Sequence, residues 1–424
     1  MRIAFTTLGC KINQYETDRM RQDLEAWGGT IVPFSGEADV YVINTCSVTA
    51  RTDYQCRQAI RSAVRKGKGA KVVVTGCYAE TRPDEIRKIA GVDLVLGNQE
   101  KGEIVNRLLL DTVREDQPGP TSMAADISPV HGRTRGFLKI QDGCDSRCTY
   151  CIVPLARGPS RSIPLEKVTE QFDALLQAGC PEIVLSGIHI GRYGEDLSDG
   201  PDLAGLLRNL LSRRGGSRIR VSSIEPNEIS QGLIELIGDG LCRHLHIPLQ
   251  SGDDGILASM NREYISLTYR NLLDSLAGRI PSIALGADVM VGFPGEGDVQ
   301  FQNTLHLIER SPLTHLHVFS YSPRPGTPAA SMSGQVPEQV KKERSKLLRD
   351  LGQKKNQAFR RSFAGQELVV VVEDKVDALS GLLTGLSDNY IRMTLKGANG
   401  ADIGEKRTVK VTEVDEKRTF SVIL

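Results

Sequence analysis

Three cysteines, Cys144, Cys148 and Cys151, follow one another with the spacing C-x3-C-x2-C. Thiolates this close can converge on one soft metal centre, and iron–sulfur cubanes are held by cysteines. A fourth cysteine usually completes such a set, but the next ones in the chain are Cys180 and Cys242. Three ligands would leave one iron open to a small molecule, which indicates chemistry more than electron storage.

A zinc site or a group of buried structural cysteines is the alternative interpretation. Zinc sites favour paired C-x2-C units with four ligands in total, which this stretch lacks. With Tyr150 before its last cysteine, the stretch resembles the signature of radical S-adenosylmethionine enzymes. The resemblance implies that the open iron is chelated by the amino and carboxylate groups of S-adenosylmethionine. It also implies that the reduced cluster cleaves this cofactor to a 5′-deoxyadenosyl radical.

The elements before this motif predict an N-terminal domain over residues 1–119. Apolar strands are expected at Arg2–Leu8, Asp39–Asn44 and Lys71–Thr75, with helices between them, which is typical of an open parallel α/β sheet. Sites in such sheets form beyond the carboxyl ends of the strands. One cysteine follows each strand end, so we expect all three to lie at one edge: Cys10, Cys46 and Cys77.

This second trio could be ordinary buried cysteines, because free cysteine is often buried. Equivalent positions in a repeating unit instead favour a second three-cysteine [4Fe-4S] cluster. The segments Leu8–Glu16, Asn44–Thr49 and Thr75–Tyr78 resemble the methylthiotransferase family. That resemblance implies an N-terminal three-cysteine domain, a radical S-adenosylmethionine core and a C-terminal TRAM domain. It also implies that the second cluster presents sulfur on its own open iron.

Size and composition are those of an ordinary globular protein. A length of 424 residues suggests about three domains, and the net charge of +1 gives no field across the whole chain that would attract nucleic acid. The nine cysteines, an odd number without a recognisable signal peptide, favour metal ligation in a reducing cytoplasm over a disulfide framework. No apolar run of membrane-spanning length is present. Residues 120–132 are rich in small, polar and proline residues and are expected to form a linker.

Residues 133–336 alternate predicted strands and helices. Six βα units predict a partial (β/α)6 barrel, with its site at the carboxyl ends of the strands. Polar and glycine residues recur at those ends and are the candidates for binding S-adenosylmethionine, although an ordinary turn is as good an explanation for each one alone. The candidates are Ser186, Gly187, Ser222, Glu225, Gln250 and Asp288.

The C-terminal part reads as a basic helical connector, residues 337–361, followed by a small all-β barrel over residues 362–424. The barrel resembles the TRAM domain, an RNA-binding module, although acidic residues offset many of its basic ones. RNA contact is therefore expected from one face of the barrel and from two arginines after the cluster motif. The candidates are Arg157, Arg161, Arg392, Lys396, Lys406, Arg407 and Lys410.

Together these features predict a tRNA methylthiotransferase with two [4Fe-4S] clusters and S-adenosylmethionine. Gly9–Glu16 and Gln141–Cys144 look closest to the branch that acts on N6-threonylcarbamoyladenosine in the tRNA anticodon stem-loop. The family implies a sulfur donor and a reductant such as flavodoxin or ferredoxin. The rivals are the isopentenyladenosine branch, the ribosomal protein S12 branch, and a non-catalytic iron–sulfur protein that binds RNA or senses redox state.

Overall fold

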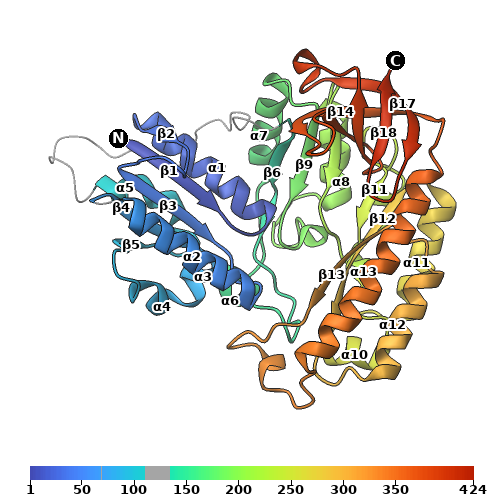
Figure 1. The fold of residues 1–424 in the computed structure, drawn as a ribbon, viewed down its shortest axis with the longest axis horizontal. Helices are drawn as coiled ribbons and strands as arrows, with labels where there is room; N and C mark the ends of the chain where they lie inside the picture. The colour runs from blue at the N-terminus through green and yellow to red at the C-terminus, as the bar shows by residue number, and fades with distance from the viewer. Residues whose placement is uncertain (68, 110–133) are drawn as a thin grey trace. The chain divides into compact units, whose positions relative to one another are not determined.

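The computed structural model describes residues 1–67, 69–109 and 134–424 (Figure 1). The chain forms two compact units. The first unit consists of the described parts of Met1–Ser128 with Asp142–Arg161 and Ser322–Ala330. The second consists of the described parts of Pro129–Gln141 with Ser162–Tyr321 and Ser331–Leu424. The predicted linker, residues 120–132, lies outside the described residues.

A five-stranded parallel sheet forms the centre of the first unit, with the order β2-β1-β3-β4-β5. The three strands expected from the sequence are its central three, so the predicted parallel sheet is confirmed. The two short edge strands were not expected. The strands are β1 (Arg2–Thr7), β2 (Thr30–Val32), β3 (Val40–Thr45), β4 (Lys71–Gly76) and β5 (Leu94–Val95).

Both faces of this sheet are buried under helices. Alternate residues of a strand point to opposite faces, and in β3 Tyr41 packs with one apolar cluster while Val42 packs with the other. The first cluster includes residues of α2, α3 and α4, and the second includes residues of α1 and α5. The helices of this unit are α1 (Lys11–Ala26), α2 (Ala50–Lys66), α3 (Cys77–Thr81), α4 (Pro83–Arg87), α5 (Ile104–Leu109) and α6 (Val153–Arg157).

The core of the second unit contains the six strands that the sequence predicted, in two three-stranded parallel sheets. Their orders are β10-β9-β6 and β11-β12-β13, and parallel bridges from Ile219 to Leu241 and from Ser223 to His246 link them. The order β6-β9-β10-β11-β12-β13 therefore follows the chain, as a partial barrel requires. The strands are β6 (Gly136–Lys139), β9 (Glu182–Ser186), β10 (Arg218–Val221), β11 (His244–His246), β12 (Ala284–Val291) and β13 (His315–Ser320).

Helices alternate with these strands, as expected for βα units. The longer ones are α7 (Leu165–Gln177), α8 (Leu203–Arg213), α11 (Ser266–Arg279) and α12 (Asp298–Arg310), and the shorter ones are α9 (Gln231–Ile234) and α10 (Asp254–Ser259). Two very short strands, β7 (Gln141–Asp142) and β8 (Arg161–Ser162), flank the segment that carries the C-x3-C-x2-C motif.

The C-terminal part begins with α13 (Glu338–Arg361), whose bounds agree with the predicted helix. A closed five-stranded barrel with the order β14-β15-β16-β18-β17 follows (Figure 1), which confirms the predicted all-β barrel. Its strands are β14 (Glu367–Val376), β15 (Leu383–Ser387), β16 (Arg392–Lys396), β17 (Lys406–Val414) and β18 (Thr419–Ile423). None of the helices in the described parts of the chain has the length and apolarity needed to cross a membrane.

Buried ion pairs attach this barrel to the core of the second unit. Arg220 donates to both carboxylate oxygens of the fully buried Glu182 and also to the backbone carbonyls of Ser387 and Asp388. Arg218 bonds Glu182 at 2.7 Å and the Leu386 carbonyl at 2.7 Å. Buried charges are tolerated when they are paired and fully hydrogen-bonded, so this network fixes the barrel against β9 and β10.

Candidate metal centre and cofactor site

The sheet of the first unit brings Cys10, Cys46 and Cys77 to one edge. Strands β1, β3 and β4 are adjacent and parallel, with Asn44 beside both Thr7 and Thr75 and with Thr45 beside Gly76. Cys46 and Cys77 directly follow two of these strand ends, and Cys10 follows the third by a short turn. This placement agrees with the expectation that the three thiols meet at the carboxyl edge of the sheet.

Two glycines make this convergence possible. Gly9 has a φ of +108°, and a Cβ there would lie 2.6 Å from the Cβ of Cys46 and 2.9 Å from its Sγ. Gly76 has a φ of +98°, and a Cβ there would lie 2.3 Å from the carbonyl oxygen of Thr45. Both positions need positive φ and close backbone approach, which glycine alone tolerates.

Asparagine side chains hold the three cysteine turns together. The amide of Asn13 donates to the carbonyls of Leu8 and Thr45, at 2.8 and 2.9 Å, and the amide of Asn44 donates to the Asn13 carbonyl at 2.8 Å. The amide of Asn98, which the sequence did not single out, lies 3.7 Å from the Sγ of Cys77. Hydrogen bonds to metal-bound sulfurs tune such centres, so Asn98 belongs to the candidate site.

The environment of Cys46 disfavours a free thiolate. Burial raises the pKa of its thiol to about 12, and the neighbouring Cys77 and Cys10 act in the same direction. A thiolate here would therefore need a compensating cation, which is what a metal supplies. Cys56 is fully buried on α2, and its thiol bonds the carbonyl of Cys46, so its role here is structural.

The C-x3-C-x2-C segment forms a tight loop within the same first unit. Gly143 begins it with a φ of +73°, and a Cβ there would lie 1.9 Å from the carbonyl oxygen of Pro159. The backbone amide of Cys144 bonds the carbonyl of Gly158 at 3.1 Å, which closes the loop against the end of α6. The backbone amide of Ser146 bonds the Sγ of Cys144 at 3.4 Å.

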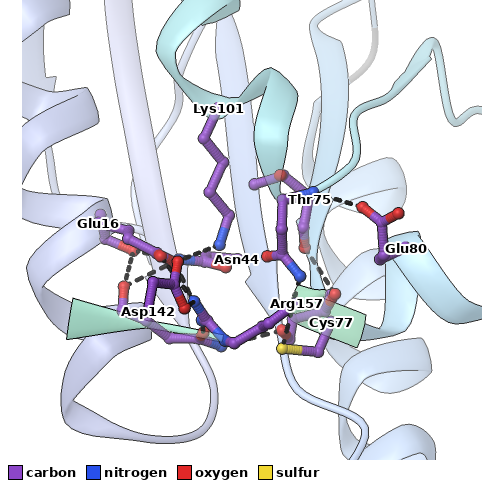
Figure 2. A network of polar contacts seen from close by, with 12 residues as sticks. Glu16, Asn44, Thr75, Cys77, Glu80, Lys101, Asp142 and Arg157 are labelled. Atoms are coloured by element: carbon purple, nitrogen blue, oxygen red, sulfur yellow. Dashed lines mark hydrogen bonds and ion pairs between the residues drawn. The ribbon is translucent and has the colours of Figure 1, made fainter. Parts of the chain in front are cut away.

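A buried polar network connects this loop with the helix that follows Cys10 (Figure 2). Arg157, only 3% exposed, donates to Glu16 Oε1 at 2.8 Å, to Asp142 Oδ1 at 2.9 Å and to Asn13 Oδ1 at 2.6 Å. The buried Lys101 also pairs with Glu16. The guanidinium of Arg157 is thus enclosed and bonded to Glu16, Asp142 and Asn13 inside the protein, so we do not propose its expected contact with RNA.

A second ion pair anchors the segment Ser322–Ala330 beside Cys46. Arg324, 2% exposed, pairs with Asp53 of α2 and donates to the hydroxyl of Ser47 at 3.2 Å. Ser47 in turn donates to Asp53 at 2.9 Å. The residue after Cys46 is thus fixed by a buried arginine from a distant part of the chain.

Neither trio is arranged around one ion. Within residues 1–67, 69–109 and 134–424, no three His, Cys, Asp or Glu side chains are grouped so as to hold a single metal ion. A cubane has a different requirement, because each thiolate binds a different iron atom. The three thiols at adjacent strand ends, with the Asn98 amide facing Cys77, fit such a group. The three thiols of the C-x3-C-x2-C loop, where the Ser146 amide bonds the Sγ of Cys144, fit one as well.

Two of the six candidates for S-adenosylmethionine are held in place by tight packing. Ser186 is 1% exposed, and its hydroxyl bonds the carbonyl of Val184 in its own strand. A Cβ at Gly187 would lie 2.6 Å from Ile190 and 3.0 Å from the Oε1 of Gln141. The Oε1 of Gln141 accepts hydrogen bonds from the backbone amides of the two residues after Gly187, and these bonds hold the strand end in place.

Two other candidates carry polar atoms that lack partners. Within the described residues, the buried Oγ of Ser222 and the buried Oε1 of Gln250 have no hydrogen-bond partner. Gln250 also has a φ of +59°, which is uncommon for a residue other than glycine. Strain and unsatisfied polar groups gather at ligand sites, and both residues follow strands of the core at the predicted end.

The remaining two candidates already have strong partners. Glu225 pairs with Arg262, and burial raises its pKa above the ordinary value. Asp288 accepts hydrogen bonds from His246 Nε2 at 3.1 Å and from His317 Nδ1 at 2.7 Å. Contact of either carboxylate with the cofactor remains a prediction.

The basic residues expected to bind RNA do not share one environment. Arg161 is exposed, Lys406 bonds the carbonyl of Gly216, and Arg407 pairs with Asp402 at 2.8 Å. Arg392 pairs with Glu373 at 3.1 Å. Lys396 and Lys410 both lie beside Val422 in the barrel, so these two lysines flank one strand.

Comparison with known proteins covers both units. Residues 2–97 match the family described as Uncharacterized protein family UPF0004, and residues 138–308 match the Radical SAM superfamily. The chain is 40% identical to the Bacillus subtilis (strain 168) protein named Threonylcarbamoyladenosine tRNA methylthiotransferase MtaB, over 96% of this chain and 93% of that one. The Thermotoga maritima protein of the same name is 36% identical, over 99% and 96%.

A solved structure supports the fold. The radical S-adenosylmethionine methyltransferase TsrM from Kitasatospora setae, with cobalamin and a [4Fe-4S] cluster bound, is similar to this chain with a TM-score of 0.59. The similarity extends over 78% of this chain and 77% of that one, at 16% sequence identity. At this identity the likeness concerns the fold alone.

Proposed function

The chain belongs to the threonylcarbamoyladenosine branch of the radical S-adenosylmethionine methylthiotransferases, and we propose that it converts N6-threonylcarbamoyladenosine beside the tRNA anticodon to its 2-methylthio derivative. One observation carries the proposal. The three cysteines at the sheet edge and the three of the C-x3-C-x2-C loop lie in the same compact unit. The C2–H bond of adenine has no acidic proton near neutral pH, so its replacement by a C–S bond favours radical chemistry.

The two trios have separate roles in this proposal. Cys144, Cys148 and Cys151 would hold the radical-generating [4Fe-4S] cluster, and the trio of Cys10, Cys46 and Cys77 would hold a second. When bound, the first group with S-adenosylmethionine supplies a 5′-deoxyadenosyl radical, and the second supplies sulfur. The chain itself positions the thiolates, through the glycine turns at the sheet edge and the Gly143 turn before Cys144.

Polar groups within each unit support this division of roles. Asn98 and the backbone amide of Ser146 each direct an N–H toward a cysteine sulfur. Ser222 Oγ and Gln250 Oε1 offer unsatisfied polar atoms for S-adenosylmethionine at the strand ends of the core. Contacts of Ser186, Gly187, Glu225 and Asp288 with the cofactor are part of the same proposal.

The tRNA is proposed to contact the exposed basic residues Arg161, Lys396 and Lys410, with Arg392, Lys406 and Arg407 contributing if their present partners are exchanged. A low-potential electron carrier such as flavodoxin or ferredoxin would reduce the radical-generating cluster, and a separate donor would supply sulfur. The location proposed for this reaction on tRNA is the cytoplasm.

Nucleoside analysis tests the proposed reaction. Bulk tRNA from a strain that lacks the gene is expected to retain N6-threonylcarbamoyladenosine and to lose its 2-methylthio derivative, and the intact gene is expected to restore it. A gene carrying Cys56→Ala is the matched control and restores it as well, whereas Cys46→Ala does not. An unchanged level of the 2-methylthio nucleoside in the deletion strain would overturn the proposal.

A further inference from the structure

A cavity of about 440 Å³ lies between α13 and the C-terminal barrel, entirely within the second unit. Its walls include Arg349 and Arg360 from α13, Arg392 from β16, and Lys417 from the turn before β18. No aspartate or glutamate is among its lining residues. A hollow with four cations and no carboxylate in its walls favours an anionic ligand.

The cations keep donors available for such a ligand. Across residues 1–67, 69–109 and 134–424, neither Arg349 nor Lys417 has a carboxylate partner, and the side chain of Arg349 only bonds the carbonyl of Val318 at 3.3 Å. Arg392 pairs with Glu373, and its side chain is still 41% exposed. Unpaired exposed cations beside a concave surface are what a phosphate group would neutralise.

Arg360 builds the site without being its exposed contact. It is 5% exposed and donates to the carbonyl of Glu416 at 2.6 Å and to the carbonyl of Arg418 at 2.7 Å. These two bonds fix the turn on both sides of Lys417. The position of Lys417 at the cavity wall is therefore set by a buried arginine of α13.

The aromatic side chains of the cavity argue for a phosphate rather than a base. The ring of Tyr390 already stacks on His244, with ring centroids 4.1 Å apart, and the guanidinium of Arg220 lies over it at 5.2 Å. His315 is neutral near pH 7, because burial lowers its pKa to about 4. Tyr390 has a φ of +65°, so the chain adopts an uncommon conformation at this wall.

We propose that this cavity, called here the α13–barrel pocket and defined by Arg349, Arg360, Arg392 and Lys417, binds a backbone phosphate of the substrate RNA. The inference rests on the proposed function, since it takes tRNA as the substrate. It adds a contact with RNA between α13 and the barrel to the contacts already proposed on the barrel surface. The chemistry would be charge-assisted hydrogen bonds to phosphate oxygens, with no reading of base sequence.

Salt-dependent binding of tRNA to the full-length, cluster-loaded protein tests the pocket. Arg349→Gln and Lys417→Gln remove one exposed cation each and leave the brace of Arg360 intact. Each variant is expected to bind tRNA more weakly, and the slope of log affinity against log salt is expected to fall in magnitude by about 1. Lys354→Gln, on the exposed side of α13 and outside the cavity lining, is the matched control and should leave the slope at its wild-type value.

The outcomes separate the possible sources of phosphate. If 10 mM inorganic phosphate raises the melting temperature of the wild type but not of the variants, while all bind tRNA equally, the pocket takes a free anion and the RNA proposal is overturned. Wild-type slopes in both variants overturn it in the same way. The production of 5′-deoxyadenosine without tRNA should be unchanged in both variants, since neither touches the clusters. A wild type that makes 5′-deoxyadenosine yet neither binds nor modifies tRNA would instead end the proposed function, and this inference with it.

Discussion

Arg157 Nη1 donates to Glu16 Oε1 at 2.8 Å across 141 positions of sequence. The bond joins α6, which follows the C-x3-C-x2-C loop, to α1, which follows Cys10. Both side chains are buried, and Lys101, Asn13 and Asp142 complete their hydrogen bonding (Figure 2). The segments that carry the two cysteine trios are therefore held together by a charged network inside one compact unit.

Replacing Arg157 should weaken this unit. Arg157→Ala leaves Glu16 with only Lys101 as a charged partner and removes the bond from Arg157 to Asp142. We therefore expect the free energy of unfolding to fall by about 3 kcal/mol, which is at the lower end of the range for breaking a buried ion pair. Urea denaturation of the metal-free protein measures it. Arg51→Gln, at an exposed position of α2, is the control and should cost less than about 0.5 kcal/mol. Equal losses in both variants would contradict the anchoring role.

Gly143→Ala should displace the loop of the C-x3-C-x2-C motif. The added Cβ would meet the carbonyl oxygen of Pro159 at 1.9 Å, in addition to the strain of a positive φ. Gly179→Ala is the matched control, because Gly179 has a φ of +75° but no atom within 4 Å of the added Cβ. We expect iron content and the cluster's absorbance to fall by about half in Gly143→Ala, if one of two equal clusters is lost. Full iron content in that variant would contradict the geometry.

Asn98→Ala should lower the affinity of the cysteine trio at the sheet edge for its cluster. The substitution removes the amide that faces the Sγ of Cys77, and loss of such outer partners typically lowers metal affinity about 10-fold or more. The rate at which iron is released to a chelator under anaerobic conditions measures this loss of affinity. Asn106→Ala, on the exposed face of α5, serves for comparison and should release iron at the wild-type rate. An Asn98 variant that matches this control would remove Asn98 from the site.

The pair formed by Asp288 and His317 should make stability depend on pH. The hydrogen bond to Asp288 is the main cause that raises the pKa of His317, against the effects of burial and of Arg349. Burial by itself raises the pKa of Asp288, yet its bonds to His246 and His317 outweigh this and hold the pKa well below its ordinary value. The contribution of this pair to the free energy of unfolding is therefore fully present below the ordinary histidine pKa of about 6.5. It is lost as the pH rises through the raised pKa of His317.

Thermal unfolding of His317→Gln from pH 5 to pH 9 measures this effect. The variant should be less stable than the wild type at the acidic end, and the difference should vanish toward the alkaline end. His306→Gln, on an exposed histidine of α12, is expected to show a constant difference. A difference in melting temperature between wild type and His317→Gln that grows as the pH rises would contradict the stabilising role of this ion pair.

Several features were predictable because they depend on local pattern. The central strands of both units are apolar runs, and their order follows from βα alternation. The cysteines at the sheet edge could be placed because parallel strands share a carboxyl edge. The bounds of α13 followed from its helical composition.

Other features depend on contacts that the sequence does not encode locally. The edge strands β2 and β5 have three and two residues, too few to show a pattern, and β15 is interrupted by Gly385 at a tightly packed position. The parallel pairing of β16 with β18 closes the barrel out of chain order. Arg157 looked like a surface arginine because its partner, Glu16, lies in another domain of the sequence.

Iron content and Mössbauer spectra of the anaerobically reconstituted protein test the central claim, that two cysteine trios each hold a cluster. We expect about eight irons per chain in the wild type and in Cys56→Ala, and about four in each triple alanine variant of a trio, all in four-iron clusters. About four irons in the wild type, with none lost when Cys10, Cys46 and Cys77 are replaced together, would contradict the account.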